Sequence, residues 1–213
     1  GAVTYLNARP LIVGLADEAP WAEIVVDLPS RLADGLKGGT LDVAMIPSVE
    51  YFRIPGATAV SDACIAAEGP VRSVMLYSRV PAERIRTLAL DEGSRTSAAL
   101  ARILLAERFG LEPVLERLPI GATAAETTTD AVMLIGDRGM LPPPEGFSLV
   151  WDLAEEWNRW TGLPFVFAVW VARPGLPLEG LDRLFATARD RGIQRLEAIA
   201  ADAALTIGVP EAE

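Results

Sequence analysis

Polar side chains that suit a small anionic ligand follow several of the apolar segments of this 213-residue chain. Asn7 and Arg9 come after the run AVTYL, and Ser48 comes after LDVAMIP. An amide beside a guanidinium at the end of a strand is what a carboxylate or a hydroxyl-bearing ligand requires. The spacing leaves a second interpretation for Asn7 and Ser48, because both residue types are preferred N-caps of helices.

The segment DEGSRTSAAL gathers hydroxyl groups at the predicted start of a helix. Ser94, Thr96 and Ser97 lie where backbone N–H groups and the helix dipole favour a carboxylate or a phosphate. The alternative is that Ser94 serves only as an N-cap and that the other two hydroxyls lie in solvent. The Gly-Lys pair of a P-loop is missing, which argues against a nucleotide site of that kind.

Two further segments carry polar groups that have both a functional and a structural interpretation. In LIGDRG, Asp137 follows an apolar run and either orients a ligand hydroxyl or bonds its own backbone in a turn. In LAEEWNRW, the two tryptophans share one helical face, which favours packing over ligand stacking. Glu155 and Glu156 are adjacent and face different ways on a helix, so we do not expect a paired-carboxylate site.

The residue types that are scarce in the chain exclude several chemistries. Histidine is absent and Cys64 is the one cysteine, so imidazole acid–base catalysis, a Ser-His or Cys-His nucleophile and an internal disulfide are excluded. The same scarcity argues against a zinc site, and we expect neither a metal nor a cofactor. A single cysteine also favours a cytoplasmic location.

The charge and hydropathy of the chain point to a small-molecule partner. A formal net charge of −10 gives no electrostatic footprint for nucleic acid or for an anionic membrane. No uninterrupted apolar run reaches the ~18 residues of a membrane-spanning helix. A few arginines or backbone N–H groups facing a cleft are enough to bind an anion to an acidic protein.

Strands alternate with helices along the chain, which predicts an α/β fold. The first fifty residues read as βαβαβ, with Pro10 and Pro29 at early helical positions. The clearest helix follows Ser94 and ends at Gly110. Apolar strands at 72–79 and 163–173 bracket an inserted segment, and one or two helices close the chain.

This order predicts two lobes joined by a double crossover, each a mainly parallel sheet flanked by helices. Lobe 1 comprises residues 1–72 and 166–213, and lobe 2 comprises residues 73–165. A cleft between lobes is an ordinary place for a small-ligand site. Ligands gather at the carboxyl ends of parallel strands, where the polar residues above are found.

Six segments, taken in order, resemble the chorismate dehydratase family of the futalosine route to menaquinone. They are VTYLNARPL, LDVAMIPSVEYFR, GPVRSVMLYS, LALDEGSRTSAALARILL, LIGDRG and WTGLPFVFAVWVAR. The resemblance implies the two-lobed fold of type II periplasmic binding proteins, here used by a hydro-lyase. The implied reaction converts chorismate to 3-[(1-carboxyvinyl)oxy]benzoate, the first step of that route.

The resemblance also implies roles for the candidate residues. Ser94, Thr96 and Ser97 would bind one carboxylate of the substrate, and Ser48, Ser73 and Arg9 the other. Asn7 would be the catalytic residue, polarising the leaving hydroxyl or orienting a proton acceptor, with Asp137 also in contact with the substrate. The acceptor we expect is the enolpyruvyl carboxylate of the substrate, while a surface salt bridge would explain Arg9 equally well.

Two alternatives to this activity are open on the sequence. One is a noncatalytic solute-binding protein of the same fold, which would bind a small carboxylate without consuming it. The other is the paralogous enzyme of the same pathway that processes cyclic dehypoxanthine futalosine.

Overall fold

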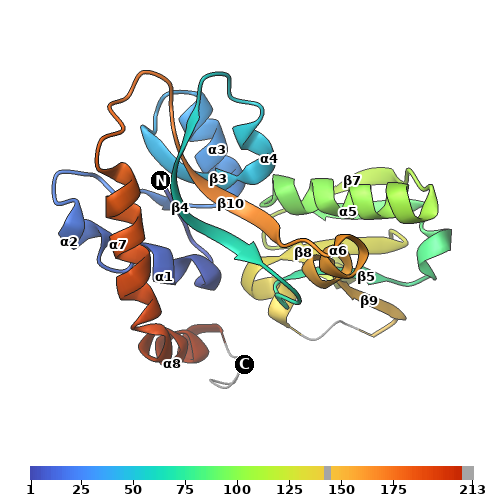
Figure 1. The fold of residues 1–213 in the computed structure, drawn as a ribbon. Helices are drawn as coiled ribbons and strands as arrows, with labels where there is room; N and C mark the ends of the chain where they lie inside the picture. The colour runs from blue at the N-terminus through green and yellow to red at the C-terminus, as the bar shows by residue number, and fades with distance from the viewer. Residues whose placement is uncertain (142–144, 208–213) are drawn as a thin grey trace. The chain divides into compact units, whose positions relative to one another are not determined.

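Contacts within the chain divide it into two units. The structure is a computed structural model that describes residues 1–141 and 145–207 (Figure 1). Unit 1 comprises residues 1–65 and 166–213, and unit 2 comprises residues 66–165. The first boundary therefore lies within strand β4 (Thr58–Ala67), whereas the predicted lobes divide at residue 72.

The strands of unit 1 form two small sheets. β1 (Ala2–Val3) pairs in parallel with β2 (Val26–Asp27). The second sheet has the order β3-β10-β4, in which β3 (Val43–Pro47) is antiparallel to β10 (Phe165–Ala172). The Gly1 amine donates to the Val43 carbonyl (2.6 Å) and the Met45 N–H to the Gly1 carbonyl (2.9 Å), as in a parallel ladder. β1 and β3 therefore end at the same edge.

The strand order places β4 beside β10, on the side opposite β3. The sequence predicted apolar strands at 72–79 and 163–173 that bracket an insert, and of these 163–173 corresponds to β10. β5 (Val74–Ser78) belongs to the sheet of unit 2 instead. Strand pairing is a long-range property that apolar character alone does not determine.

Short helices surround the sheets of unit 1, and two longer ones close the chain as predicted. They are η1 (Leu6–Ala8), α1 (Arg9–Ile12), α2 (Leu15–Glu18), α3 (Pro29–Lys37), α4 (Ser48–Tyr51), α7 (Leu181–Ile193) and α8 (Leu196–Ile207). The single helix predicted after Pro10 is wrong: Gly14 adopts a φ of +83°, a left-handed conformation that separates α1 from α2.

Helix α7 packs closely on the N-terminal segment of unit 1. A Cβ atom at Gly192 would lie 1.7 Å from the Pro10 carbonyl oxygen, so only glycine fits at this contact. Arg191 forms an ion pair with Glu18 of α2. On the sheet side, Phe185 of α7 stacks on Trp170 of β10 with ring centroids 4.1 Å apart, and both side chains are buried. Helix α7 thus completes the core of unit 1.

Unit 2 is built on a five-stranded sheet with the order β7-β6-β8-β5-β9. The strands after β5 are β6 (Thr87–Asp91), β7 (Val114–Leu118), β8 (Ala131–Ile135) and β9 (Leu149–Asp152). β6 is parallel to β7 and β8, whereas β5 is antiparallel to β8 and β9. The sheet is therefore mixed rather than mainly parallel, because β5 runs opposite to its neighbours β8 and β9. The strand β9 was not predicted from the sequence.

The helices of unit 2 begin and end at local signals in the sequence. α5 (Arg95–Phe109) begins after the N-cap Ser94 and ends at Gly110, whose φ is +65°. α6 (Leu153–Thr161) begins after the N-cap Asp152 and ends at Gly162. The end of α5 at Gly110 was predicted. Shorter turns are η2 (Ala82–Arg84), η3 (Ala124–Glu126) and η4 (Gly136–Met140).

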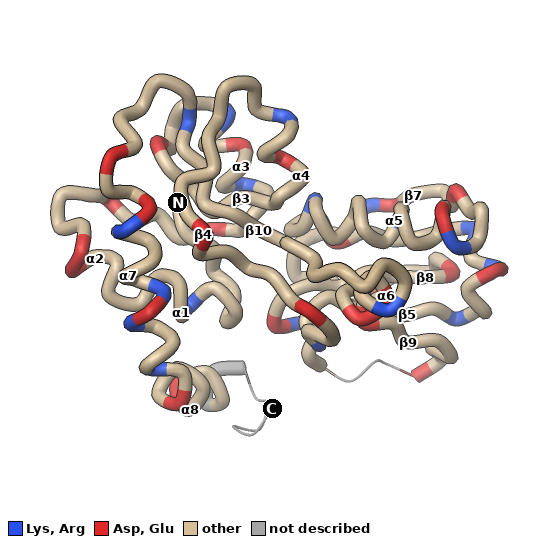
Figure 2. The backbone as a smooth tube through the Cα atoms, viewed as in Figure 1, with Lys and Arg blue, Asp and Glu red and all other residues tan. Residues whose placement is uncertain are grey.

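The tryptophan pair of α6 packs as expected. The Trp157 ring meets Trp160 edge to face at 5.9 Å and Phe165 at 5.3 Å. Acidic and basic residues are interspersed along both units (Figure 2). No helix among the described residues is long and apolar enough to cross a membrane.

Candidate functional site

Several of the predicted residues of unit 2 meet at one edge of its sheet. β6 and β8 are parallel and end at Asp91 and Ile135, while β5, which is antiparallel to β8, begins there with Val74 opposite Ile135. The segments next to these ends carry Ser73, the hydroxyl residues at the start of α5, and Asp137. The carboxyl edge of this sheet is therefore the candidate binding edge of unit 2.

The start of α5 is arranged around Ser94. Its hydroxyl oxygen accepts the Ser97 N–H (3.2 Å) and its O–H donates to the Ser97 hydroxyl (2.8 Å). Ser94 is thus the N-cap that the alternative interpretation expected. Thr96 and Ser97 are only 3% and 2% exposed, however, so the expectation that they lie in solvent is wrong. Ser94 orients Ser97 at a helix N-terminus, where an anion is favoured.

A buried ion pair that the sequence analysis missed lies at the same edge. The Asp91 side chain is fully buried, and the Arg138 guanidinium donates to its Oδ2 atom (2.5 Å). Asp91 also accepts the Gly93 N–H (2.8 Å), and Arg138 also donates to the Ala122 carbonyl (2.7 Å). The pair ties η4, and with it Asp137, to the loop that leads into α5.

Burial dominates the acidity of Asp91. Desolvation raises the pKa of this carboxyl above its usual 3.8, and the Gly93 N–H and the Arg138 cation offset only part of that effect. The signal in the sequence was a charged residue at the end of an apolar strand, in TLALDEG, and an arginine in LIGDRG. Because 47 residues separate the partners, the sequence does not indicate that they pair.

Ser73 lies between β5 and η4 with its hydroxyl group unengaged. The residue is 9% exposed, and its side chain has no hydrogen-bond partner among the described residues. Gly139 of η4 packs on its backbone, because a Cβ atom there would lie 2.9 Å from the Ser73 carbonyl oxygen. The Tyr77 hydroxyl donates to the Gly139 carbonyl (3.1 Å). Asp137 is half-buried in η4.

In unit 1, Asn7 and Ser48 follow β1 and β3, which end at one edge. Asn7 lies in η1, is exposed, and makes no side-chain hydrogen bond to the described part of the chain. The N-cap of α1 is Ala8, which makes no capping bond, so the capping interpretation of Asn7 is wrong. An exposed amide without a partner is available to a ligand.

Ser48 and Arg9 are both engaged within unit 1. Ser48 is the first residue of α4 rather than its N-cap, and its hydroxyl donates to the Val166 carbonyl of β10 (2.7 Å). Arg9 donates to the Asp202 carboxylate of α8 (2.8 Å), an acceptor whose side chain is 74% exposed. The surface salt bridge offered as the alternative for Arg9 is present.

A cavity of about 320 Å³ in unit 1 lies apart from these residues. It is lined mainly by apolar side chains, among them Leu15, Trp21, Leu41, Trp170 and Phe185, and by none of the predicted site residues. Across residues 1–141 and 145–207, no group of three or more Cys, Asp or Glu side chains is arranged to hold a metal ion.

Comparison with solved structures supports the predicted fold. The chain superposes on protein AF1704 from Archaeoglobus fulgidus with a TM-score of 0.74 and 16% identity, covering 98% of this chain and 81% of that one. It also resembles the periplasmic aliphatic sulphonate binding protein SsuA from Escherichia coli, with a TM-score of 0.56 and 14% identity over 95% and 71% of the two chains. The fold is therefore that of periplasmic solute-binding proteins.

Comparison with sequences identifies closer relatives. A family model described as menaquinone biosynthesis matches residues 1–212. The chorismate dehydratase of Thermus thermophilus is 31% identical over 98% of this chain and 82% of its own length. That of Campylobacter jejuni is 29% identical over 79% of this chain and 64% of its own. The chain therefore belongs to the menaquinone-biosynthesis family.

Proposed function

We propose that the protein is a chorismate dehydratase, a hydro-lyase that converts chorismate to 3-[(1-carboxyvinyl)oxy]benzoate in menaquinone biosynthesis. The observation that carries this proposal is the 31% identity to the Thermus thermophilus chorismate dehydratase over 98% of the chain. The same reaction was expected from the six ordered sequence segments. A location in the cytoplasm fits this biosynthetic role and is part of the proposal.

The reaction suits a protein without histidine. The C3 hydrogen of chorismate is vinylogous to the ring carboxylate, so the electron pair left when that C–H bond breaks delocalises into the carboxylate. The C4–O bond then breaks, hydroxide leaves and takes up a proton as water, and the ring becomes aromatic. The protein has to bind two carboxylates, stabilise charge on one, and polarise the leaving hydroxyl.

We assign one carboxylate to the candidate binding edge of unit 2. Ser97 and Thr96 lie at the N-terminus of α5, a place where backbone N–H groups and the helix dipole favour negative charge. Ser94 acts on the substrate chiefly by orienting Ser97, because its own O–H is already donated to that hydroxyl. Asp137 lies in η4 beside this edge and is assigned to a hydroxyl of the substrate.

Ser73, Ser48 and Asn7 are assigned to the rest of the substrate. The Ser73 O–H has no partner in the described chain and is the readier donor to the second carboxylate. Ser48 would have to exchange its bond to the Val166 carbonyl for one to the substrate. Asn7, exposed and without a side-chain hydrogen bond in the described chain, is assigned to the leaving C4 hydroxyl. Arg9 can contact the substrate only if its salt bridge to Asp202 breaks.

The direct test is to mix the purified protein with chorismate and to follow the loss of diene absorbance together with the appearance of an aromatic product. We expect one molecule of aromatic product for each molecule of chorismate consumed, without added metal or cofactor. Chorismate that is bound tightly but recovered unchanged would contradict the proposal and favour a solute-binding role. Turnover of cyclic dehypoxanthine futalosine in place of chorismate would contradict it in favour of the paralogous enzyme.

A further inference from the structure

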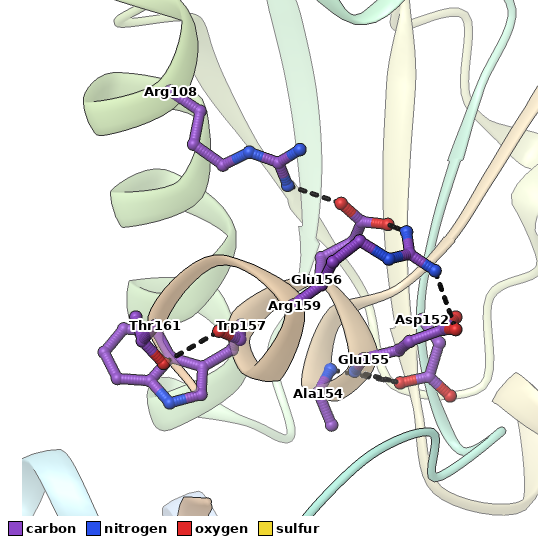
Figure 3. Close-up of polar contacts among 8 residues, drawn as sticks. All are labelled: Arg108, Asp152, Ala154, Glu155, Glu156, Trp157, Arg159 and Thr161. Carbon is purple, nitrogen blue, oxygen red and sulfur yellow. Dashed lines mark hydrogen bonds and ion pairs between the residues drawn. The ribbon is translucent and has the colours of Figure 1, made fainter. Parts of the chain in front are cut away.

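The Asp152 carboxylate accepts four backbone N–H groups from two separate segments of unit 2. Its Oδ1 atom accepts from Ala154 (3.0 Å) and Glu155 (3.2 Å), which caps α6 (Figure 3). Its Oδ2 atom accepts from Val71 (2.7 Å) and Arg72 (2.6 Å), some eighty residues earlier in the chain. Asp152 is only 7% exposed. One side chain therefore fixes both a helix start and a distant loop.

The loop held by Asp152 has an unusual backbone. Arg72 has a φ of +57°, and among the described residues it is the only one other than glycine with a positive φ. A side chain in this left-handed region is energetically unfavourable and persists where the surroundings determine it. Successive N–H groups that turn toward one oxygen form a concave anion site, and the Asp152 carboxylate occupies it here. Removing that carboxylate removes the interaction that favours the strained conformation.

Ser73 follows this residue directly and is held on its other side by Gly139. Its hydroxyl is nearly buried and has no hydrogen-bond partner within the described ranges. The Ser73 carbonyl lies against Gly139, and Val74 begins β5 opposite Ile135. The direction of the Ser73 side chain therefore depends on the backbone turn at Arg72.

We propose that Asp152 is a positioning residue for substrate binding: by holding the Val71 and Arg72 N–H groups, it directs the Ser73 hydroxyl to a carboxylate of the substrate. The inference rests on the proposed function, from which it takes the role of Ser73. In a purely structural role, Asp152 would only cap α6, and its loss would not affect substrate binding through Ser73.

The two roles separate in the variant Asp152→Ser. Serine is a preferred N-cap, so its single oxygen still serves the start of α6, but it has no second oxygen for Val71 and Arg72. Losing a hydrogen bond between a hydroxyl and a charged carboxylate weakens binding about tenfold to a hundredfold. We expect Asp152→Ser and Ser73→Ala each to lower kcat/KM for chorismate by about that factor, mainly through KM.

The double variant tests whether Asp152 acts through Ser73. Because the two residues would form one unit, Asp152→Ser should cost little further activity in the Ser73→Ala background. Glu156→Gln is the matched control, because it alters a buried carboxylate of the same helix that contacts Arg108 and Arg159 instead of the loop (Figure 3). We expect its kcat/KM to stay within about twofold of the wild type.

Losses that multiply in the double variant, or an unchanged kcat/KM in Asp152→Ser, would overturn the inference. Should Asp152→Ser not fold, Asp152→Asn serves in its place, since its amide NH₂ cannot accept from one of the two N–H pairs. A wild type that leaves chorismate unchanged would refute the proposed function instead. Amide hydrogen exchange without substrate would then test whether Asp152 holds the loop. Faster exchange of the Val71 and Arg72 amides in the variant would support this role of Asp152, and unchanged protection would refute it.

Discussion

At the scale of single residues, Asn7 is an amide that the fold does not use. It is exposed, caps no helix, and makes no side-chain hydrogen bond to the described chain. We therefore expect Asn7→Ala to change the free energy of unfolding by less than about 0.5 kcal/mol. Turnover of chorismate should fall about a hundredfold or more, because a donor to the leaving hydroxyl is removed.

Steady-state kinetics and urea unfolding of the same preparation test this separation of activity from stability. Asn158→Ala is the control, since its amide donates to the Leu163 carbonyl just after α6 (3.3 Å) and, within the described residues, to no other group. We expect the control to keep its turnover. Near-normal turnover in Asn7→Ala would remove Asn7 from the site.

Unlike Asn7, Asp91 and Arg138 are expected to stabilise the fold, because they form a buried ion pair. Arg138→Met would leave the Asp91 carboxylate buried without its cation, which should lower the free energy of unfolding at pH 7 by about 3 kcal/mol. Burial already raises the pKa of Asp91, and losing Arg138 raises it further. A group with a raised folded-state pKa stabilises the fold at low pH and loses that contribution as the pH rises.

The defect of Arg138→Met should therefore shrink as the pH falls from 7 toward 5 and Asp91 takes up a proton. Urea unfolding of variant and wild type at both pH values measures it. A loss of stability that is the same at both pH values would contradict the burial of an unpaired charge.

At the scale of elements, α6 is joined to α5 through one buried carboxylate. Glu156, with a side chain 7% exposed, pairs with Arg108 of α5 and with Arg159 of its own helix (Figure 3). Its neighbour Glu155 also pairs with Arg159 (2.8 Å) but is 43% exposed. Although adjacent glutamates face different ways, Arg159 reaches both, which the sequence analysis did not anticipate.

The two glutamates form a matched pair of substitutions. Glu156→Gln should lower the free energy of unfolding by about 2 kcal/mol, because charged hydrogen bonds between α5 and α6 are lost from a buried place. Glu155→Gln should cost less than about 1 kcal/mol, since exposed ion pairs contribute little. Urea unfolding measures both, and equal losses would show that burial does not govern the contribution of this cluster.

Elements with local signals were predictable from the sequence, and those defined by distant pairing were not. Ser94 and Gly110 delimit α5 because capping depends on a few neighbouring residues. The pairing of β4 with β10 depends on hydrogen bonds between segments about a hundred residues apart, which apolar composition does not encode. The Asp91–Arg138 pair was not predicted for the same reason, since its partners are 47 residues apart. Ser94, by contrast, was predicted from its local position at the helix start.

At the scale of the whole molecule, the last helices complete the unit that carries Asn7. Gly192 of α7 lies against the Pro10 backbone, three residues after Asn7. Gly192→Ala would force α7 away from α1, and overpacking of this kind costs about 3 kcal/mol. We expect a loss of that size in urea unfolding, together with a lower kcat/KM for chorismate, because the segment after Asn7 moves.

Arg191→Ala is the control for this contact. Its side chain is 48% exposed and pairs with Glu18, so its removal should cost less than about 1 kcal/mol and leave turnover unchanged. Wild-type stability in Gly192→Ala would contradict the close approach of α7 to Pro10.

The division of unit 1 between residues 1–65 and 166–213 bears on how the protein is made. A ribosome adds residues at about 5–20 per second, so Asn7 is made roughly ten seconds or more before α7, whose Phe185 stacks on Trp170. Unit 2 is continuous in the chain and needs no later residues for its sheet. The nascent polypeptide can therefore form the unit that carries Ser97 before α7 is synthesised, whereas the unit that carries Asn7 is completed only afterwards.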